Sequence, residues 1–260
     1  MSTNMARCLL LAFVIGAVLC GNAILRADIV AYWAFDETRE DGITPNSGSG
    51  GAALNGKLVG DARLRADVGD GTITRGSVLE LDGAGDWVQI NHPVTTFGQD
   101  NSFTIAAWVK TEAAGMAILG KDNADGMLDG ADKIFFVKEA AGGRDVGFVG
   151  CGQEWVSATG TKVNDGRWHH LAVVYDAMLG TQQVFVDGWN VTTETSWTAG
   201  PDHGEVVRIG MSDWADADDF RGHIDDVVIY DQALLPGQIR TLITEGPQDF
   251  DAMLLADILP

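Results

Sequence analysis

Short apolar segments recur along the chain, and clusters of Gly, Asp and Asn separate them. The segments are rich in Val, Ile, Phe, Tyr and Trp, which is typical of strands in an all-β sandwich or barrel. No long helical period appears before residue 236. Strands are predicted at Ile29–Phe35, Gly56–Val59, Val78–Leu81, Trp87–Ile90, Phe103–Lys110, Met116–Gly120, Lys133–Lys138, Val146–Cys151, Glu154–Ala158, Trp168–Tyr175, Gln182–Val186, Val191–Thr195, Val206–Ile209 and His223–Tyr230.

A single short helix is predicted at Pro236–Thr244. Proline begins it, Ile239 and Leu242 are its apolar positions, and a glycine follows its end. No repeat or low-complexity linker divides the chain. We therefore expect one all-β domain over residues 28–245, followed by a tail, residues 246–260, that is apolar but has no clear period.

The stretch DGRWHHLAVVYD, residues 165–176, places two histidines at the start of a predicted strand. Because strand side chains alternate between faces, His169 and His170 cannot bind one ion together or form a catalytic dyad. Both faces are largely apolar, as in a central strand of a sandwich. We expect the imidazoles to tie backbone or side-chain groups together at the strand entrance; the alternative is His170 as a lone ligand or base.

The first residues have the pattern of a secretory signal peptide. Arg7 precedes an apolar run, Cys8–Cys20, and small residues follow it. The run is shorter than the roughly 20 residues that a membrane span needs. Residues 1–27 are therefore predicted to be removed after Ala27, with Ala23 as the alternative, and the mature protein is expected to be secreted, periplasmic or at the cell surface, without a membrane span.

Two other fates of this segment are an uncleaved membrane anchor and a lipid anchor on Cys20. The lipid anchor is disfavoured because Leu19 is large where a small residue is needed. After cleavage only Cys151 remains, so the mature chain cannot form an internal disulfide. A buried thiol is expected there, and an intermolecular bridge is the alternative.

The chain is strongly acidic, with 17 basic and 37 acidic residues and a formal net charge of −20. Removal of the signal segment makes the charge more negative, because this segment contains two arginines and no acids. Such a surface repels phosphate backbones, so nucleic acid is not an expected partner. It favours solubility and the binding of cations.

Six stretches of the chain have a familiar composition and order: AYWAFDE (31–37), LELDGAGDWVQI (79–90), SFTIAAWVK (102–110), DGRWHHLAVVYD (165–176), VFVDG (184–188) and GHIDDVVIYDQALLPGQI (222–239). Together they resemble the LamG-like jellyroll domains of the concanavalin A-like lectin/glucanase superfamily. The resemblance covers most of the chain after residue 27, most densely over residues 102–242. The resemblance implies a sandwich of two antiparallel sheets that serves mainly as a non-catalytic module, recognising a glycan or an extracellular protein.

Catalysis is not expected. Enzymes of this fold that cut β-glucans carry two glutamates in a Glu-x-Asp-x-x-Glu pattern on one strand face, and the chain has no such pattern. Glu37 and Glu40 lie outside a predicted strand interior, while Glu139 and Glu154 stand alone. No Ser or Cys lies in a nucleophile motif. A glycoside hydrolase with an unrecognised site is the alternative.

Four acids mark a predicted calcium site. Asp36 and Glu37 end the first strand, and Asp225 and Asp226 lie in the last one. The resemblance implies that these strands are neighbours and that a structural calcium is often held there. Calcium takes about six to eight oxygen ligands. Alternation places Asp225 and Asp226 on opposite sides, so only one could face the ion. The alternative role is hydrogen bonding to turn amides.

The family loop that follows the first strand usually contains an Asp-x-Ser-Gly-Asn sequence. Here the corresponding stretch is TPNSGSGGAALNG, which lacks the acid and therefore cannot supply that ligand.

Two loops are unusually acidic, and neither follows the spacing of the twelve-residue calcium loop. Their acids are Asp122, Asp125, Asp129 and Asp132 in the first loop and Asp213, Asp216, Asp218 and Asp219 in the second. Solvated loops are expected. If the two loops meet at one rim, Asp122, Asp125 and Asp216 could hold an ion or contact a ligand.

The eight tryptophans divide into two groups. Those inside strand patterns are predicted to be core: Trp33, Trp87, Trp108 and Trp168. Those near turns are Trp155, Trp189, Trp197 and Trp214. Exposed indole rings can stack on sugars, so Trp189 and Trp214 are the preferred binding candidates. We expect a secreted module that recognises glycans or cell-surface partners, and the alternative is an adhesive protein that binds another protein without sugar.

Overall fold

The computed structural model describes residues 26–94, 97, 100–113, 115–121, 133–137, 146–150, 154–158, 160–196, 202, 206–212 and 219–250. The chain divides into two compact units. One is Ala27–Asp249, which contains every element described below; the other consists of residues 1–26 and 250–260.

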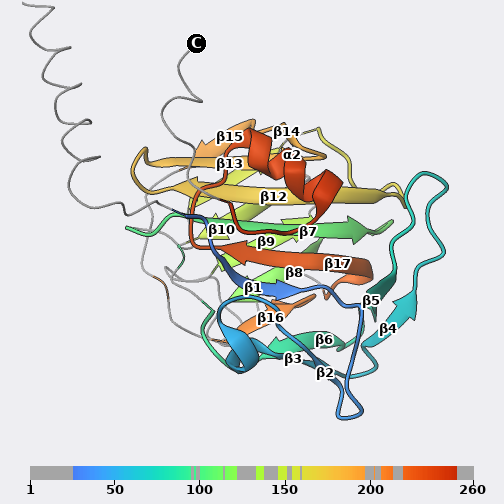
Figure 1. Cartoon of the computed structure of the whole chain (residues 1–260). Coiled ribbons are helices and arrows are strands. Elements are labelled where there is room, and N and C mark those ends of the chain that lie inside the picture. The colour runs from blue at the N-terminus through green and yellow to red at the C-terminus, as the bar shows by residue number, and fades with distance from the viewer. Residues whose placement is uncertain are drawn as a thin grey trace, which may run out of the picture. The chain divides into compact units, whose positions relative to one another are not determined.

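The unit Ala27–Asp249 is a sandwich of two antiparallel sheets (Figure 1). The eight-stranded sheet has, in spatial order, β14 (Trp189–Asn190), β13 (Thr181–Val186), β12 (Trp168–Asp176), β7 (Phe103–Lys110), β17 (Arg221–Tyr230), β5 (Ser77–Asp82) and β4 (Arg63–Ala66), and β1 (Ile29–Trp33) also pairs with β17. The nine-stranded sheet runs β15 (Glu194–Ser196), β11 (Glu154–Ala158), β10 (Val146–Gly150), β9 (Lys133–Val137), β8 (Met116–Lys121), β16 (Val207–Ile209), β6 (Trp87–Ile90), β3 (Gly56–Val59) and β2 (Ile43–Thr44). The predicted fold class, an all-β jellyroll sandwich, is confirmed.

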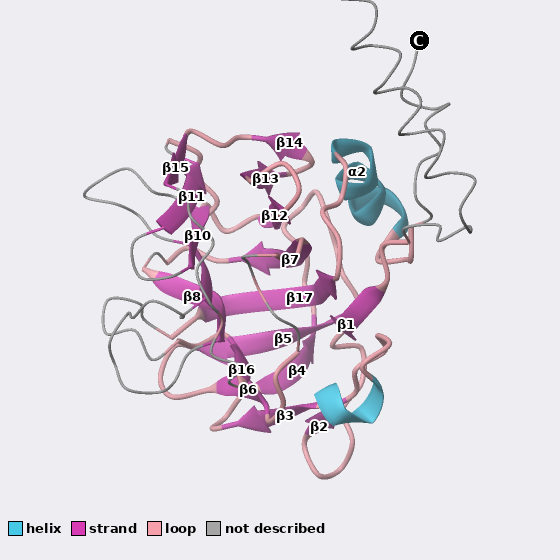
Figure 2. Ribbon diagram, turned by 90° about the vertical axis from the view of Figure 1, so that its left-hand side faces the viewer, coloured by secondary structure: helices cyan, strands magenta, loops and turns pink. Residues whose placement is uncertain are grey.

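The core lies between the two sheets, which Figure 2 shows as facing layers. Alternate residues of each strand point inward, as the period of two requires. In β7 these are Phe103, Ile105, Ala107 and Val109, and in β12 they are Leu171, Val173 and Tyr175. Most of the outward-facing residues of these two strands are buried as well. The outer faces of these two strands are therefore covered.

The helix α2 (Pro236–Glu245) covers one part of this outer face, beside β12, β13 and β14 (Figure 2). Its predicted start is confirmed, and it ends one residue later than predicted. The side chain of Gln238 accepts a hydrogen bond from the Leu235 N–H at 2.8 Å, which satisfies a free donor at the helix start. Ile239 and Leu242 are buried, and Ile243 packs on a cluster of Val78, Trp108 and Trp168.

One predicted strand, Val191–Thr195, is wrong. The chain here makes two short strands, β14 and β15, which belong to different sheets. The Oγ1 of Thr192 donates to Asn190 Oδ1 at 2.8 Å and accepts from the Val184 N–H at 2.9 Å. These local bonds turn the chain between β14 and β15, so one continuous strand cannot form.

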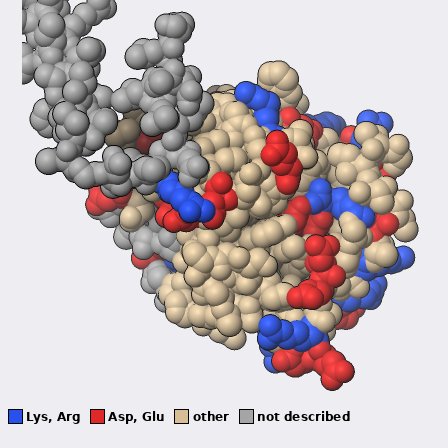
Figure 3. Space-filling view, viewed as in Figure 1, with Lys and Arg blue, Asp and Glu red and all other residues tan. Residues whose placement is uncertain are grey.

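The strands β2 and β4 were not predicted. The sequence of β4 is RLRA, and its two arginines are exposed at the edge of the sheet, where both bind Glu80 of β5. Edge strands carry charges that discourage pairing with other chains, and this weakens their apolar pattern. Acidic and basic side chains are interspersed on the face seen in Figure 3.

Candidate functional site

Three polar or aromatic side chains lie side by side on the outer face of the eight-stranded sheet. Strand register places Trp108 of β7 opposite both His170 of β12 and Asp225 of β17. All three residues are buried, with exposed fractions of 5%, 3% and 3% respectively. A buried polar row on an outer face requires a cover, and the chain supplies one between β4 and β5.

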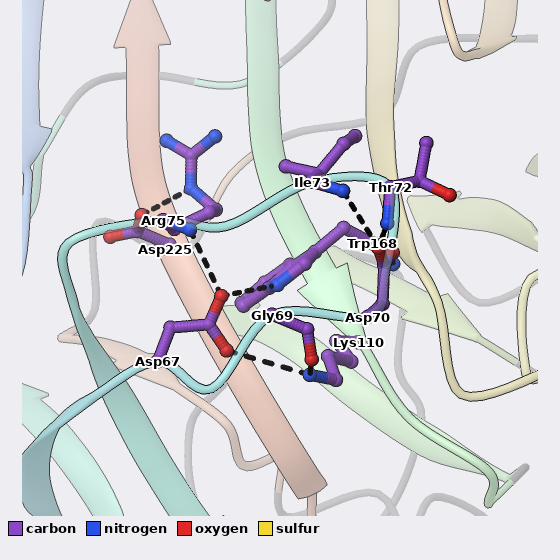
Figure 4. Close-up of polar contacts among 9 residues, drawn as sticks. All are labelled: Asp67, Gly69, Asp70, Thr72, Ile73, Arg75, Lys110, Trp168 and Asp225. Carbon is purple, nitrogen blue, oxygen red and sulfur yellow. Dashed lines mark hydrogen bonds and ion pairs between the residues drawn. The ribbon is translucent and has the colours of Figure 1, made fainter.

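This cover is formed by residues Asp67–Gly76, which we call the covering segment (Figure 4). Its ends meet through the hydrogen bond from the Asp67 N–H to the Gly76 carbonyl at 3.0 Å. Within it, Asp70 Oδ1 accepts the N–H groups of Thr72 and Ile73, both at 2.7 Å. Asp and Gly favour such turns because the short carboxylate bonds to nearby amides and glycine tolerates positive φ.

The covering segment is fastened to the sheet by its two aspartates. Asp67 Oδ2 accepts from Trp168 Nε1 at 2.9 Å, and Asp70 Oδ2 accepts from the Trp168 N–H at 2.8 Å. Lys110 donates to the Gly69 carbonyl at 2.5 Å. The bonds from the backbone of Ile73 and then of Trp168 lower the pKa of Asp70 to about 2. Asp70 is therefore ionised at physiological pH and holds the segment down.

Arg75, near the end of the covering segment, lies over the polar row. Its guanidinium carbon is 4.7 Å from the centre of the Trp108 ring, close enough for a cation–π interaction. The same guanidinium forms ion pairs with Asp225 and Asp226. The hydroxyl of Tyr32 donates to Asp226 Oδ1 at 2.5 Å. Arg75 therefore joins the covering segment to the last strand of the chain.

The prediction that Asp225 and Asp226 face opposite sides is wrong. The register of β17 against β7 shifts between Asp225 and Val228, and Asp226 has a φ of 45°. Ile224 and Val227 both point into the core, so Asp226 is the extra residue of a β-bulge. The bulge brings both carboxylates to one guanidinium.

Burial governs the protonation of this acid pair. It raises the pKa of Asp225 to about 7, and the negative charge of Asp226 acts in the same direction, although Arg75 opposes both. Burial also raises the pKa of Asp226. The Oδ1 atom of Asp225 is buried and has no hydrogen-bond partner within the described part of the chain.

The predicted calcium site is brought together only in part. Asp36 lies near the acid pair. Its Oδ1 would be 3.2 Å from a Cβ placed on Gly76, the residue after Arg75, and its negative charge helps to raise the pKa of Asp226. Asp36 and Glu37 are both exposed, and Glu37 lies in the irregular stretch that follows β1. A calcium ion needs oxygen ligands at about 2.3–2.6 Å, but the Arg75 guanidinium lies between the two carboxylates. The acids do not fit a metal ion in this arrangement; calcium binding stays a prediction.

A different acidic group was missed. Oxygen atoms of Asp61, Asp82 and Asp86 lie within 4.8 Å of one another, the one such cluster of three found in the described residues. Asp86 accepts the N–H groups of Asp82 at 2.8 Å and Gly83 at 3.2 Å. Its carboxylate therefore stabilises the turn between β5 and β6. Only the turn spacing Asp-Gly-x-Gly-Asp could have indicated this role.

The structural role predicted for the double histidine is confirmed for His169. Its Nδ1 is 2.8 Å from Asp187 Oδ2, and its Nε2 is 3.1 Å from Asp165 Oδ1. Asp187 Oδ1 also accepts the N–H of His170 at 2.9 Å. The imidazole of His170 instead packs edge-on against Trp108, with ring centres 5.3 Å apart. Burial lowers the pKa of His170 to about 4, so this ring is neutral at physiological pH.

Five of the eight tryptophans can be placed as buried or exposed in the described part of the chain, and four of these five follow the prediction. Trp33, Trp108 and Trp168 are buried, and Trp189 is 70% exposed. Trp87 was predicted to be core but is half-buried on the outer face of the nine-stranded sheet, because its neighbour Val88 takes the inward position. The candidates Trp214, Asp122, Asp125 and Asp216 lie outside the described residues.

Comparison with known proteins now identifies the class. The fold is an antiparallel two-sheet sandwich of lectin-like type, and residues 82–240 match a laminin G family model described as the concanavalin A-like lectin/glucanases superfamily. Because the match covers more than half of the sequence, the chain belongs to this superfamily, as the sequence predicted.

Individual relatives are more distant. A Rattus norvegicus protein named for its sushi, von Willebrand factor type A, EGF and pentraxin domains is 30% identical over 95 residues, which are 34% of this chain and 3% of that protein. The chain therefore spans only a small part of this relative.

Two examples among the solved structures illustrate the shared fold. Domain 4 of AbnA, an extracellular arabinanase from Geobacillus stearothermophilus in complex with arabinotriose, has a TM-score of 0.62 and 20% identity and covers 84% of this chain and 98% of that one. The binding domain of Paraclostridial Mosquitocidal Protein 1 has a TM-score of 0.54 and 11% identity, covering 83% and 51%. Within the described part of our chain, no helix is long and apolar enough to cross a membrane.

Proposed function

We propose that this protein is a non-catalytic recognition module that binds short oligosaccharides through Trp189. The observation that carries the proposal is the exposure of this indole, 70%, on a short edge strand. Because the indole stays exposed in the folded protein, the free energy that burial of its apolar surface would contribute is not gained on folding. A sugar can cover the ring, because its C–H face stacks on the indole while its hydroxyl groups stay hydrated.

The surroundings of Trp189 suit a sugar better than an apolar partner. The preceding turn carries Asp187, which is exposed, and the next residue is the exposed Asn190. On α2, Arg240 lies beside the turn, because a Cβ placed on Gly188 would be 2.8 Å from its Cγ. Asp187 and Asn190 are chain neighbours of Trp189 and Arg240 lies beside the turn, so a carboxylate, an amide and a guanidinium could bind the hydroxyl groups of a stacked sugar.

Arabinotriose is the first ligand to test, because a domain of the same fold was solved with it. We expect titration calorimetry to detect binding of arabinotriose or of another short oligosaccharide from a glycan array. Trp189→Ala should weaken this binding by about tenfold, a typical loss for one stacking contact. Its melting temperature should match that of wild type, because the ring is exposed.

A second surface provides the matched control. Trp87 donates to Gln89 Oε1 at 3.2 Å, and Arg208 of β16 is the register partner of Gln89. This half-buried aromatic, amide and guanidinium group lies on the other sheet. If Trp87→Ala abolishes binding and Trp189→Ala leaves it unchanged, the sugar binds the nine-stranded sheet and the assignment to Trp189 is wrong. If wild type binds no glycan of the array, a protein partner becomes the better hypothesis.

The absence of catalysis is part of the proposal. It is supported by the lack of a paired-glutamate motif in the sequence. We expect no turnover of any oligosaccharide that binds. Turnover that disappears when one carboxylate is replaced would contradict this.

We further infer that the protein is exported and matures at Asp28. The inference is supported by the basic start and the apolar run of the first residues. N-terminal sequencing of the exported protein should begin at Asp28, and material that starts at the first methionine would contradict it.

A further inference from the structure

We propose that Arg75 is the built-in cation of the site between the first and last strands, and that its guanidinium takes the place there of a structural metal ion. The covering segment brings Arg75 to Asp225 and Asp226, which lie 150 and 151 positions later in the chain. The exposed fractions of the three side chains are 16%, 5% and 14%. Two carboxylates this deeply buried require a positive charge close by.

The geometry of the acids suits a planar cation. Arg75 donates from Nε to Asp225 and from Nη2 to Asp226, so two separate carboxylates use two positions of one rigid fork. Arginine is the side chain that can do this, since its donors are fixed in one plane and it stays charged at all relevant pH values. The β-bulge at Asp226 is what aligns both carboxylates with the fork.

The other walls of the site also suit a guanidinium better than a metal. The face of Trp108 lies 4.7 Å from the guanidinium carbon and offers no ligand atom to calcium. Tyr32 presents its hydroxyl as a donor to Asp226, and this occupies one carboxylate oxygen. A flat cation between an aromatic face and two carboxylates is stabilised by both.

The role of Arg75 extends to the covering segment. The Arg75 N–H donates to Asp67 Oδ2 at 2.9 Å, and the same oxygen accepts from Trp168 Nε1. The backbone of Arg75 therefore helps to close the covering segment, while its side chain pairs with two acids of β17. Loss of the guanidinium removes the positive charge that pairs with both Asp225 and Asp226. The Asp225 Oδ1 atom already has no hydrogen-bond partner in the described residues.

The first test compares melting temperatures in chelator, in calcium and in magnesium. Wild type should melt at the same temperature in all three. In chelator, Arg75→Met should melt several degrees below wild type. Calcium should raise the melting temperature of Arg75→Met but leave that of wild type unchanged. Arg63→Met is the matched control, because Arg63 pairs with Glu80 at 2.8 Å but is 57% exposed; it should change melting only slightly.

A double-mutant cycle tests the charge pairing itself. Asp226→Asn should destabilise wild type but stabilise Arg75→Met, because it removes a partner in the first protein and a repelling charge in the second. If Arg75→Met does not fold, Arg75→Lys is the second variant, because it keeps the charge without the fork. It should fold, melt below wild type and stay insensitive to chelator.

Three results would overturn the proposal. The first is a wild type that melts lower in chelator and recovers with calcium. The second is bound calcium that stays with wild type through gel filtration. The third is that Asp226→Asn changes the free energy of unfolding by the same amount, with the same sign, in wild type and in Arg75→Met.

Discussion

At the scale of single residues, Asp187 organises the entrance of β12. Its two oxygens bind the imidazole of His169 and the backbone N–H of His170, although Asp187 itself has a φ of 50°. Aspartate tolerates this conformation better than most residues because its carboxylate bonds locally. The hydrogen bond from His169, with the nearby charge of Asp187, makes the protonated imidazole the favoured form, and it raises the pKa of His169.

This pKa shift predicts how stability depends on pH. A histidine whose pKa is higher in the folded state stabilises the protein fully below its unfolded pKa, 6.5, and the contribution disappears as pH rises through the folded pKa. The stability difference between wild type and His169→Gln should therefore be larger at about pH 5.5 than at about pH 8.5. Urea unfolding at both pH values measures it.

Near pH 5.5 we expect the His169→Gln difference to be about 1 kcal/mol, a typical cost for a point change. Oligosaccharide affinity should stay nearly the same, because the His170 N–H still holds Asp187 in place when the imidazole is replaced. A difference that grows with increasing pH would show that the neutral ring is the stabilising form.

At the scale of elements, the covering segment explains why the middle of the eight-stranded sheet is buried on both faces. The sequence of β12 has no polar alternation after His170, and its outward residues are buried. At the start of β12, Ile73 of the covering segment and Ile243 of α2 pack on the cluster that contains Trp168. Alternation is lost where an outer face is buried. The covering segment is held by single residues, so its stability can be tested with point changes.

Asp70→Ala is predicted to loosen the covering segment. It removes the acceptor of three backbone N–H groups, those of Thr72, Ile73 and Trp168. An unpaired buried donor costs about 1–3 kcal/mol. Because one of these donors is exposed and two are only partly buried, we expect destabilisation of about 1 kcal/mol. Limited proteolysis should then cut within residues 67–76 faster than in wild type.

Asp70→Asn is the control, because its amide oxygen can still accept some of these hydrogen bonds. It should lose less free energy of unfolding than Asp70→Ala. If Asp70→Ala and Asp70→Asn unfold at the same denaturant concentration as wild type, the carboxylate does not hold the segment in solution.

At the scale of the whole molecule, the net charge of −20 dominates the electrostatics. Local pairs such as Arg63 with Glu80 neutralise part of it, but most acids remain in excess. Like charges on a compact body repel one another, and salt screens this repulsion over a Debye length of about 10 Å at 0.1 M.

The melting temperature is therefore predicted to rise with sodium chloride from low ionic strength to about 0.5 M. Potassium chloride should act equally, because the effect is screening and not the binding of a particular cation. Scanning calorimetry at constant pH measures it. A melting temperature that falls with both salts would mean that favourable ion pairs outweigh the repulsion.

The sequence by itself determined most of the elements. The predicted strands Gly56–Val59, Trp87–Ile90, Phe103–Lys110 and Glu154–Ala158 have the observed bounds, and α2 begins at its predicted proline. Branched and aromatic runs bounded by turn residues act locally, over a few neighbours, so they are readable without a structure. The exposure of Trp189 was also readable, since this residue directly follows the Asp187-Gly188 turn.

Tertiary structure alone decided the polar site. Nothing near Arg75 in the sequence indicates that its partners lie 150 positions away, and a period of two cannot reveal that a bulge turns Asp226 toward the same guanidinium as Asp225. It also decided that Trp87 faces outward and that residues 191–195 divide between two sheets. Local patterns fix which residues form strands, whereas register, bulges and long-range ion pairs depend on how distant strands close against one another.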